Sequence, residues 1–355
     1  MESLGINRKF WQNRRVFLTG HTGFKGGWLA LWLMDMGAKV YGYSLEPPTN
    51  PNLFEVAQVK DGMAASSIAD LRDLPTLKKK LNAAEPEIVI HMAAQPLVRH
   101  SYLHPIETYE INVMGTLHLF EAIRATQGVR SVVNITTDKC YENKEWCWGY
   151  RENDSLGGHD PYSSSKACVE ILTEAWRRSY MREAGIALAT VRAGNVIGGG
   201  DWACDRLIPD FLRALDDKKT LNIRSPHAIR PWQHVLEPLA GYISLAEKLF
   251  NQGEPYAEPW NFGPDYSDAR SVQWVIEYLC SVANYSGWQC SNDEQPHEAQ
   301  YLKLDNSKAN TKLGWHPKWH LKTALDKTFE WHNAWKQNND MRKISLAQIH
   351  SYEDF

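Results

Sequence analysis

A glycine-rich turn near the start of the chain constrains the fold more than any other stretch. The apolar, β-prone residues 16–18 are followed by glycines at positions 20, 23 and 26, and residues 28–33 then have the composition of a helix. A strand, a tight turn and a helix in this order let a pyrophosphate approach the backbone, and the positive end of the helix faces its phosphates. The spacing GxxGxxG differs from the usual GxGxxG, so a purely structural turn is the alternative. The predicted contacts of this turn to a dinucleotide are Gly20, His21, Thr22, Gly23, Phe24, Lys25 and Gly26.

Strands then alternate with helices along the first half of the chain. A second strand over 39–43 favours dinucleotide binding, and further apolar strands are predicted at 87–92, 131–136 and 186–191, with helices over 107–125 and from 161 to about 180. This alternation predicts an α/β fold with a parallel, doubly wound sheet of the Rossmann type. Residues 1–194 plus about 233–262 are expected to form the dinucleotide-binding domain. About 195–232 plus 263–355 are expected to form a second, smaller α/β domain for the substrate, closed by an amphipathic helix over 321–335.

Composition excludes several classes of function. The formal net charge of -3 gives no reason to expect nucleic acid or an anionic membrane as a partner. The longest apolar run, 28–34, is too short to cross a bilayer, and the first twelve residues lack the apolar core of a signal peptide, so a cytoplasmic protein is expected. The six cysteines form no CxxC pair, which suits reduced thiols. The 13 histidines include no HExxH, so no metal site is expected.

Further cofactor residues are expected where the strands end, because ligands of doubly wound sheets bind at the carboxyl ends of the strands. The second strand ends at Ser44, where NAD enzymes usually carry an acidic residue, and Glu46 lies two residues on. No arginine follows to take a 2′-phosphate, which favours NAD over NADP. Asp70 either accepts from an adenine amino group or caps a helix expected over 71–81. The remaining predicted cofactor residues are Leu71, Ala93, Ala94, Gln95, Asn112, Thr136, Tyr162 and Lys166.

Tyr162 and Lys166 are the central chemical candidates. They are four residues apart on a predicted helix and so share one face, where the ammonium favours the phenolate form of the tyrosine. This spacing is common by chance, and a core tyrosine near a surface lysine is the alternative. Thr137, at the end of an earlier strand, strengthens the interpretation, because its hydroxyl could bind a substrate hydroxyl while Tyr162 removes the proton.

These features together resemble the extended short-chain dehydrogenase/reductase family over nearly the whole chain. Within that family the chain is most similar to the dehydratases that act on CDP-glucose, in the stretches GHTGFKGGW, AAQPLVR, TTDKCYEN, DPYSSSK, GNVIGGGDW and RPWQHV. The resemblance implies bound NAD, CDP-glucose as substrate, and CDP-4-dehydro-6-deoxyglucose and water as products. It also implies a role in deoxysugar synthesis for lipopolysaccharide, and a homodimer, or a larger homo-oligomer, formed through the helices that begin near 107 and 162.

The resemblance also implies roles for Tyr162 and for the residues that follow the strand over 131–136. Tyr162, supported by Lys166 and Thr137, takes the proton from the 4-hydroxyl of the sugar. Asp138 is the candidate acid that protonates the departing 6-hydroxyl. Lys139, where relatives acting on the thymidine-linked sugar carry Glu, either serves as the base at carbon 5 or stays cationic and steadies the enolate. The alternative for Asp138 and Lys139 is an exposed ion pair on a loop.

A cluster of basic and aromatic residues is the candidate binding site for the substrate. Arg224, Arg230, Trp232 and His234 suit a diphosphate, although a solvated loop is the alternative. The resemblance adds Asn195, Arg206 and Tyr301, while Gln95 and Arg99 are further candidates to face the sugar. Two other functions stay open: a nucleotide-sugar 4-epimerase, which has no use for the Asp138–Lys139 pair, and a catalytically silent NAD-binding regulator.

Overall fold

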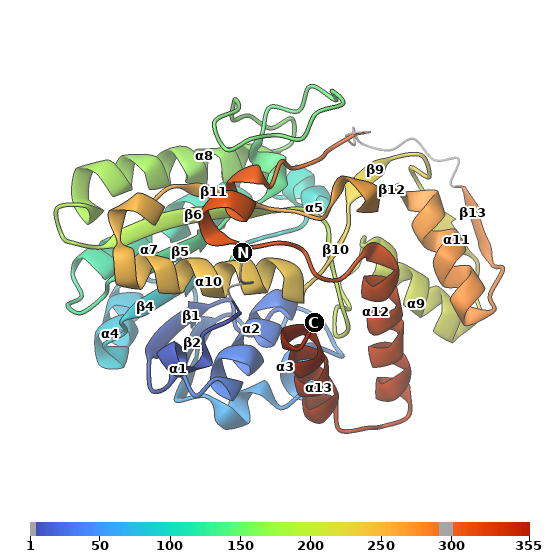
Figure 1. The fold of residues 1–355 in the computed structure, drawn as a ribbon, viewed down its shortest axis with the longest axis horizontal. Coiled ribbons are helices and arrows are strands. Elements are labelled where there is room, and N and C mark those ends of the chain that lie inside the picture. Colours follow the sequence, from blue (N-terminus) through green and yellow to red (C-terminus); the bar gives the residue numbers. More distant parts are fainter. Residues whose placement is uncertain (1–4, 291–300) are drawn as a thin grey trace.

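A seven-stranded parallel sheet forms the centre of the computed structural model, which describes residues 5–290 and 301–355 (Figure 1). The strand order is β11-β6-β5-β4-β1-β2-β3. The order reverses between β1 and β4, which is the topological switch point where doubly wound sheets bind ligands. The doubly wound sheet predicted from the sequence is therefore confirmed. Its strands are β1 (Arg15–Thr19), β2 (Lys39–Ser44), β3 (Ala65–Ile68), β4 (Ile88–His91), β5 (Ser131–Ile135), β6 (Ala187–Ala193) and β11 (Pro259–Phe262).

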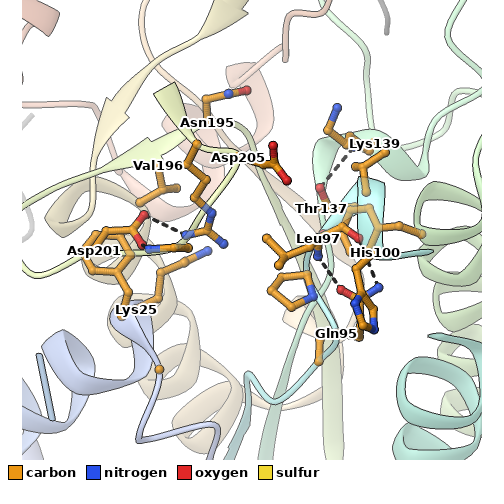
Figure 2. A pocket seen from close by; sticks show the side chains of 18 of the residues that line it. Lys25, Gln95, Leu97, His100, Thr137, Lys139, Asn195, Val196, Asp201 and Asp205 are labelled. Atoms are coloured by element: carbon orange, nitrogen blue, oxygen red, sulfur yellow. Dashed lines mark hydrogen bonds and ion pairs between the residues drawn. The ribbon is translucent and has the colours of Figure 1, made fainter. Parts of the chain in front are cut away.

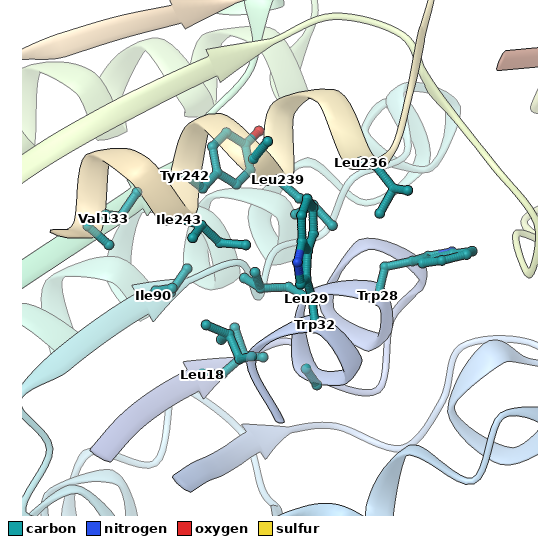
Figure 3. Close-up of a cluster of buried hydrophobic side chains, with 14 of the residues drawn as sticks. Leu18, Trp28, Leu29, Trp32, Ile90, Val133, Leu236, Leu239, Tyr242 and Ile243 are labelled. Carbon is teal, nitrogen blue, oxygen red and sulfur yellow. The ribbon is translucent and has the colours of Figure 1, made fainter. Parts of the chain in front are cut away.

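Helices cover both faces of this sheet. On one face α2 (Phe24–Asp35) and α10 (Leu236–Gln252) bury their apolar side chains against β1, β4 and β5, with Trp28 and Trp32 fully buried (Figure 3). On the other face lie α4 (Leu74–Ala84), α7 (Gly115–Arg124) and α8 (Pro161–Trp176). Because both faces are covered, every residue of the central strands β4 and β5 is buried, and these strands are mostly apolar rather than alternating.

The helix predicted over 107–125 is interrupted by a wider turn. It runs as α6 (Pro105–Tyr109), the π-helical η2 (Glu110–Met114) and α7. The turn holds Asn112, whose side chain leaves the helix to bind the loop after β4. Such π turns are frequent at functional sites. The helix α8 likewise continues as π-helical η4 (Arg177–Met181).

A second, smaller group of elements packs around its own apolar cluster. It contains α9 (Leu207–Asp217), β8 (Leu221–Ile223), α11 (Val272–Ala283) and α12 (Leu321–Lys336), and α12 agrees with the helix predicted over 321–335. That helix does not close the chain, because α13 (Met341–Glu353) follows and packs against α2 of the large sheet. The small sheets pair β7 (Val196–Ile197) with β10 (Gln233–His234), β9 (Ile229–Pro231) with β12 (Ala269–Ser271), and β8 with β13 (Trp288–Cys290).

Short helical segments complete the described chain. They are α1 (Arg8–Trp11), α3 (Leu53–Val56), η1 (Val59–Gly62), α5 (Val98–Leu103), η3 (Asp138–Cys140), η5 (Glu254–Tyr256), η6 (Tyr266–Asp268) and η7 (Ala309–Leu313). None of the helices within residues 5–290 and 301–355 has the length and apolar character needed to span a membrane.

Candidate active site

A large cavity lies at the carboxyl ends of the central strands. Its volume is about 1720 Å³, and it extends from the glycine turn to β8 and the start of α9. Pockets for single small molecules usually measure about 300–1,000 Å³, so this cavity has room for two ligands side by side. The smaller group of elements forms its far end, while the loops after β1, β4 and β5 form the near end.

The glycine turn leaves no space for side chains. Gly20 has φ of +78°, and a Cβ there would lie 2.7 Å from the backbone nitrogen of Ala93. A Cβ on Gly26 would lie 2.0 Å from the carbonyl oxygen of Gly20. Gly23 is the N-cap of α2 without a capping side chain, so the first N–H groups of this helix are available to a ligand in the cavity. This geometry fits the pyrophosphate of a dinucleotide. Of the residues predicted to contact a dinucleotide here, Gly20, Thr22, Gly23, Phe24, Lys25 and Gly26 all line the cavity.

His21 is an exception within the turn. Its side chain is fully buried, its Nε2 lies 2.8 Å from Ser66 Oγ, and its ring lies against Gly42, where a Cβ would be 2.5 Å away. Burial lowers the pKa of His21 to about 4, so the ring is neutral. His21 does not line the cavity and ties the turn to β2 and β3 instead. The predicted contact to the cofactor through this residue is therefore wrong.

The residues expected at an adenosine line one end of the cavity. Ser44 Oγ and Thr22 Oγ1 are 2.8 Å apart and face the same end as Asp70 and Leu71. The helix-cap interpretation of Asp70 is wrong, because α4 begins at Leu74 and its cap is Asp73. The Asp70 carboxylate binds Arg72, which holds the pKa of this carboxyl below its usual range.

Asn112 supports the cavity without lining it. Its Oδ1 accepts from the backbone N–H of Gln95 at 2.9 Å, and its Nδ2 donates to Gln95 O at 3.1 Å and to Ser165 Oγ at 2.9 Å. It therefore fixes the loop after β4 against α8. The sequence predicted a direct contact between Asn112 and the cofactor, which this position does not support. Ala93, Ala94 and Gln95 do line the cavity, and the amide of Gln95 is engaged by Leu97 and Thr108.

Tyr162, Lys166 and Thr137 meet inside the cavity, all three buried. Lys166 Nζ donates to Ile135 O at 3.3 Å, and burial lowers the pKa of this lysine to about 8. Burial also raises the pKa of Tyr162 to about 12, while the hydrogen bond from Thr137 acts against that rise. In the chain by itself the phenol therefore keeps its proton, because burial outweighs the hydrogen bond from Thr137.

Asp138 is a buried carboxyl in the same group. It is 3% exposed, its Oδ1 accepts from Thr137 Oγ1 at 3.1 Å, and its Oδ2 has no hydrogen-bond partner within the described residues. Burial raises the pKa of Asp138 against the opposing charges of Lys139 and Arg230. A carboxyl in this setting can hold a proton and donate it, as an acid requires. The exposed ion pair is excluded for Asp138, and Lys139 is half-buried at the cavity wall (Figure 2).

Several of the expected substrate residues converge on the other side of the cavity. Arg206 Nη1 binds Asp201 Oδ2 at 2.8 Å, and Asp205 Oδ1 lies 2.9 Å from Arg99 and 3.4 Å from Arg224. Figure 2 shows Asp201, Asn195 and Lys25 on the side opposite Thr137 and Gln95. Arg99, Asn195, Arg206, Arg224 and Arg230 all line the cavity, where arginines, three of them paired with Asp201 or Asp205, offer donors of the kind that bind a diphosphate.

Two of the predicted substrate residues lie elsewhere. His234 is fully buried between the rings of Trp28 and Trp319, with centroids 6.2 Å and 4.9 Å away, and burial lowers its pKa to about 3. It is a core residue that a ligand cannot reach. Tyr301 does not line the cavity; it bridges Ile229 through its backbone, and its carbonyl accepts from Asn143 Nδ2 at 3.1 Å.

Sequence reasoning missed the acidic partners of the arginines. Asp201 and Asp205 line the cavity in the loop that follows the glycines 198–200, and this run of glycines was the available signal. It also missed the setting of Lys25, which is half-buried with Nζ 3.3 Å from Tyr242 Oη, and whose pKa desolvation lowers to about 7. Within the part of the chain that the structure describes, no cluster of three or more His, Cys, Asp or Glu side chains could hold a metal ion.

The fold and this site define a class of dinucleotide-binding enzymes of the Rossmann type, with a Tyr–Lys pair and a buried acid. Residues 17–328 match the family described as GDP-mannose 4,6 dehydratase, and the chain belongs to this family.

Individual relatives agree with this membership. The chain is 52% identical over 353 residues to CDP-glucose 4,6-dehydratase of Salmonella typhimurium, covering 98% of both chains. It is 25% identical to dTDP-glucose 4,6-dehydratase of Shigella flexneri, covering 81% of this chain and 84% of that one. Among solved structures, a dTDP-glucose 4,6-dehydratase of Streptomyces venezuelae with NAD bound has a TM-score of 0.79 at 22% identity, covering 92% of this chain and 99% of that one. A UDP-glucose 4-epimerase of Thermotoga maritima has a TM-score of 0.78 at 21% identity, covering 90% and 99%. These two structures share the fold.

Proposed function

We propose that this chain is an NAD-dependent lyase that converts CDP-glucose to CDP-4-dehydro-6-deoxyglucose and water. The single observation that carries the reaction type is the buried Asp138, whose raised pKa keeps an acid beside Tyr162 and Thr137. An elimination needs such an acid, whereas a 4-epimerase expels no hydroxyl and so has no leaving group to protonate. The choice of CDP-glucose is supported by the relative that is 52% identical over almost the whole chain.

The residues present fit NAD at the sheet end of the cavity. The first turn of α2 would hold the pyrophosphate, and Ser44 and Asp70 would contact the adenosine. When bound, NAD supplies an acceptor for the hydride of carbon 4 and later returns that hydride to carbon 6. Ala93 and Ala94 let the cofactor approach the sheet because their side chains are small.

The first half of the reaction oxidises the sugar at carbon 4. Thr137 holds the 4-hydroxyl, and Tyr162 removes its proton as the hydride leaves carbon 4. Lys166 Nζ lies one helical turn from Tyr162 and stabilises the developing phenolate. Since burial alone raises the pKa of Tyr162 to about 12, this support is needed when the proton moves.

The second half eliminates water across carbons 5 and 6. The new ketone acidifies the hydrogen on carbon 5, and Lys139 removes it as a proton. The electron pair then forms the carbon 5–carbon 6 double bond, and the 6-hydroxyl leaves as water with the proton of Asp138. Hydride adds to carbon 6 and Lys139 returns its proton to carbon 5. The proton that Tyr162 took from the 4-hydroxyl offsets the one that Asp138 gave to the departing water, and exchange with solvent restores both groups for the next turnover. The roles given to the site residues in both halves of the reaction are part of the proposal.

An isotope experiment separates this function from the alternatives. With CDP-glucose carrying deuterium at carbon 4, we expect the product to carry that deuterium at carbon 6, because one cofactor molecule takes and returns the same hydride. Mass spectrometry with NMR of the product locates the label. Label that stays at carbon 4 of an epimerised sugar would establish the 4-epimerase instead, and absence of turnover on CDP-, dTDP-, UDP- and GDP-hexoses would favour the silent regulator.

We further propose a homodimer in the cytoplasm that serves deoxysugar synthesis for lipopolysaccharide. The helices expected at the interface carry exposed apolar side chains: Ile106 on α6 is 75% exposed and Ile171 on α8 is 60% exposed, and Leu103, at the end of α5 just before α6, is 76% exposed. In a soluble monomer an apolar patch of this kind would face water. In analytical ultracentrifugation, we expect the double variant Ile106→Asp, Ile171→Asp to sediment as a monomer. Phe355→Asp changes an equally exposed side chain and should still sediment as a dimer. A wild type that sediments as a monomer would contradict the dimer.

A further inference from the structure

A fully buried ion pair lies beneath the cavity. Glu170 on α8 and Arg192 on β6 have side chains that are each 2% exposed. Two parallel hydrogen bonds join them: Arg192 Nε donates to Glu170 Oε1 and Nη2 donates to Oε2, both at 2.9 Å. The desolvation of two charges offsets much of their attraction, so a buried pair is weak evidence for a stabilising role. The other contacts of the pair indicate what it does.

The remaining atoms of the pair bind both ends of the segment that carries the proposed acid. Glu170 Oε1 also accepts from the hydroxyl of Thr136, the residue directly before Thr137. Arg192 Nη1 donates to Tyr141 Oη at 2.7 Å, and Tyr141 directly follows the short helix η3. The segment 137–140 is therefore held at its start by the carboxylate and at its end by the guanidinium.

The same pair connects this segment to the rest of the site. Glu170 lies one helical turn after Lys166 on α8, and its charge favours the ammonium form of Lys166 against the effect of burial. Arg192 Nη1 also donates to Glu152 O at 3.1 Å, and Tyr141 Oη donates to Asn261 Oδ1 at 2.7 Å. Burial raises the pKa of Glu170, but Arg192 and the hydroxyl donors outweigh it and keep the pKa below its usual range, so the carboxylate stays charged.

We propose that Glu170 and Arg192 are positioning residues that hold the segment 137–140 at both ends and so aim the Asp138 carboxyl at the departing hydroxyl. This inference rests on the proposed function. The carboxyl of Asp138 accepts a hydrogen bond from the hydroxyl of the neighbouring Thr137, which lies on the same segment. Its direction is consequently set by the backbone of the segment, and the backbone is set by the ion pair.

Three conservative variants test the role while leaving the ion pair in place. Thr136→Val removes the link to Glu170, and Tyr141→Phe removes the link to Arg192. Thr190→Val is the matched control: Thr190 is buried and its hydroxyl also donates to Glu170, at 2.7 Å, but it lies within β6. We expect each link variant to slow the loss of water by about tenfold or more, because small misplacements of reacting groups cost rates of this order.

The readouts separate positioning from binding and folding. In rapid mixing, reduced nicotinamide should accumulate in the link variants, with the KM for CDP-glucose unchanged, whereas Thr190→Val should match the wild type. Affinity for NAD should stay unchanged in Tyr141→Phe, which lies outside the predicted cofactor contacts and so separates positioning from cofactor binding. Amide hydrogen exchange of residues 137–141 should also be faster in the link variants than in the control. Equal kinetics and equal exchange in all three variants would overturn the inference. A wild type without turnover would overturn the proposed function, and the exchange measurement would still decide whether the pair holds the segment.

Discussion

Replacement of Tyr162 by Phe is expected to lower kcat by about 10²–10⁴-fold, the usual contribution of a general base. The variant keeps the ring in its buried place on α8 and loses the hydroxyl that takes the proton from the sugar. Because oxidation at carbon 4 requires this proton transfer, no reduced nicotinamide should appear when the variant is mixed with CDP-glucose. Stopped-flow absorbance of the cofactor measures this directly.

Tyr109→Phe is the matched control for this variant. The hydroxyl of Tyr109 donates to Ser164 Oγ at 2.9 Å. Ser164 lies two residues after Tyr162 on α8, but Tyr109 is outside the cavity lining. Its turnover should stay near that of the wild type. Formation of reduced nicotinamide at the wild-type rate in Tyr162→Phe would show that another group removes the proton.

Replacement of Asp138 by Asn should also lower overall turnover by about 10²–10⁴-fold, but at a later step. The amide fits the same space and cannot protonate a leaving hydroxyl, so the sugar should be oxidised and then held as the ketone. Reduced nicotinamide is therefore expected to form in a burst and persist, in contrast to Tyr162→Phe. Because burial raises the pKa of Asp138, the wild type should keep its acid at higher pH than an exposed aspartate would allow.

The control for Asp138→Asn is Asp216→Asn. Asp216 pairs with Lys336 at 2.6 Å outside the cavity lining and should tolerate the change without loss of turnover. If Asp138→Asn releases the dehydrated product at the normal rate, water leaves without help from this carboxyl, and the observation that carries the proposed function fails.

Local sequence patterns correctly predicted the turn, strands and helix whose structure depends mainly on residues close together in the sequence. The glycines at 20, 23 and 26 predicted the turn because its backbone approaches, such as a Cβ on Gly26 at 2.0 Å from Gly20 O, exclude every other residue. The strands predicted over 87–92 and 131–136 were confirmed because strands buried on both faces carry short apolar runs, here 88–90 and 132–133. Tyr162 and Lys166 share a helical face and enter the cavity together.

Residues next to the right motif were assigned wrongly where tertiary contacts decide which way a side chain points. His21 belongs to the glycine turn, yet its ring faces Gly42 and Ser66. His234 follows Trp232 in a basic stretch, yet it lies between Trp28 and Trp319. In each case the ring packs against residues that are far away in the sequence.

The protonation states of Tyr162 and Asp138 could not be predicted without the tertiary structure. The spacing of Tyr162 and Lys166 predicts a stabilised phenolate, but burial of the phenol opposes it in the chain by itself. Burial likewise makes Asp138 a credible acid, although its sequence neighbour Lys139 suggested an ordinary ion pair. Desolvation depends on what surrounds a group in space, and no local pattern contains that information.

By itself the sequence determined the doubly wound sheet, the glycine turn and the helix that presents Tyr162 and Lys166, because each depends on periodicity and steric limits within a few residues. Only the tertiary structure decided that Glu170 and Arg192 meet under the cavity, that Thr136 and Tyr141 both bind them, and that Asp138 is enclosed. These contacts join strands and helices that are distant in the chain, and their strength comes from the exclusion of water, which only the packed fold provides.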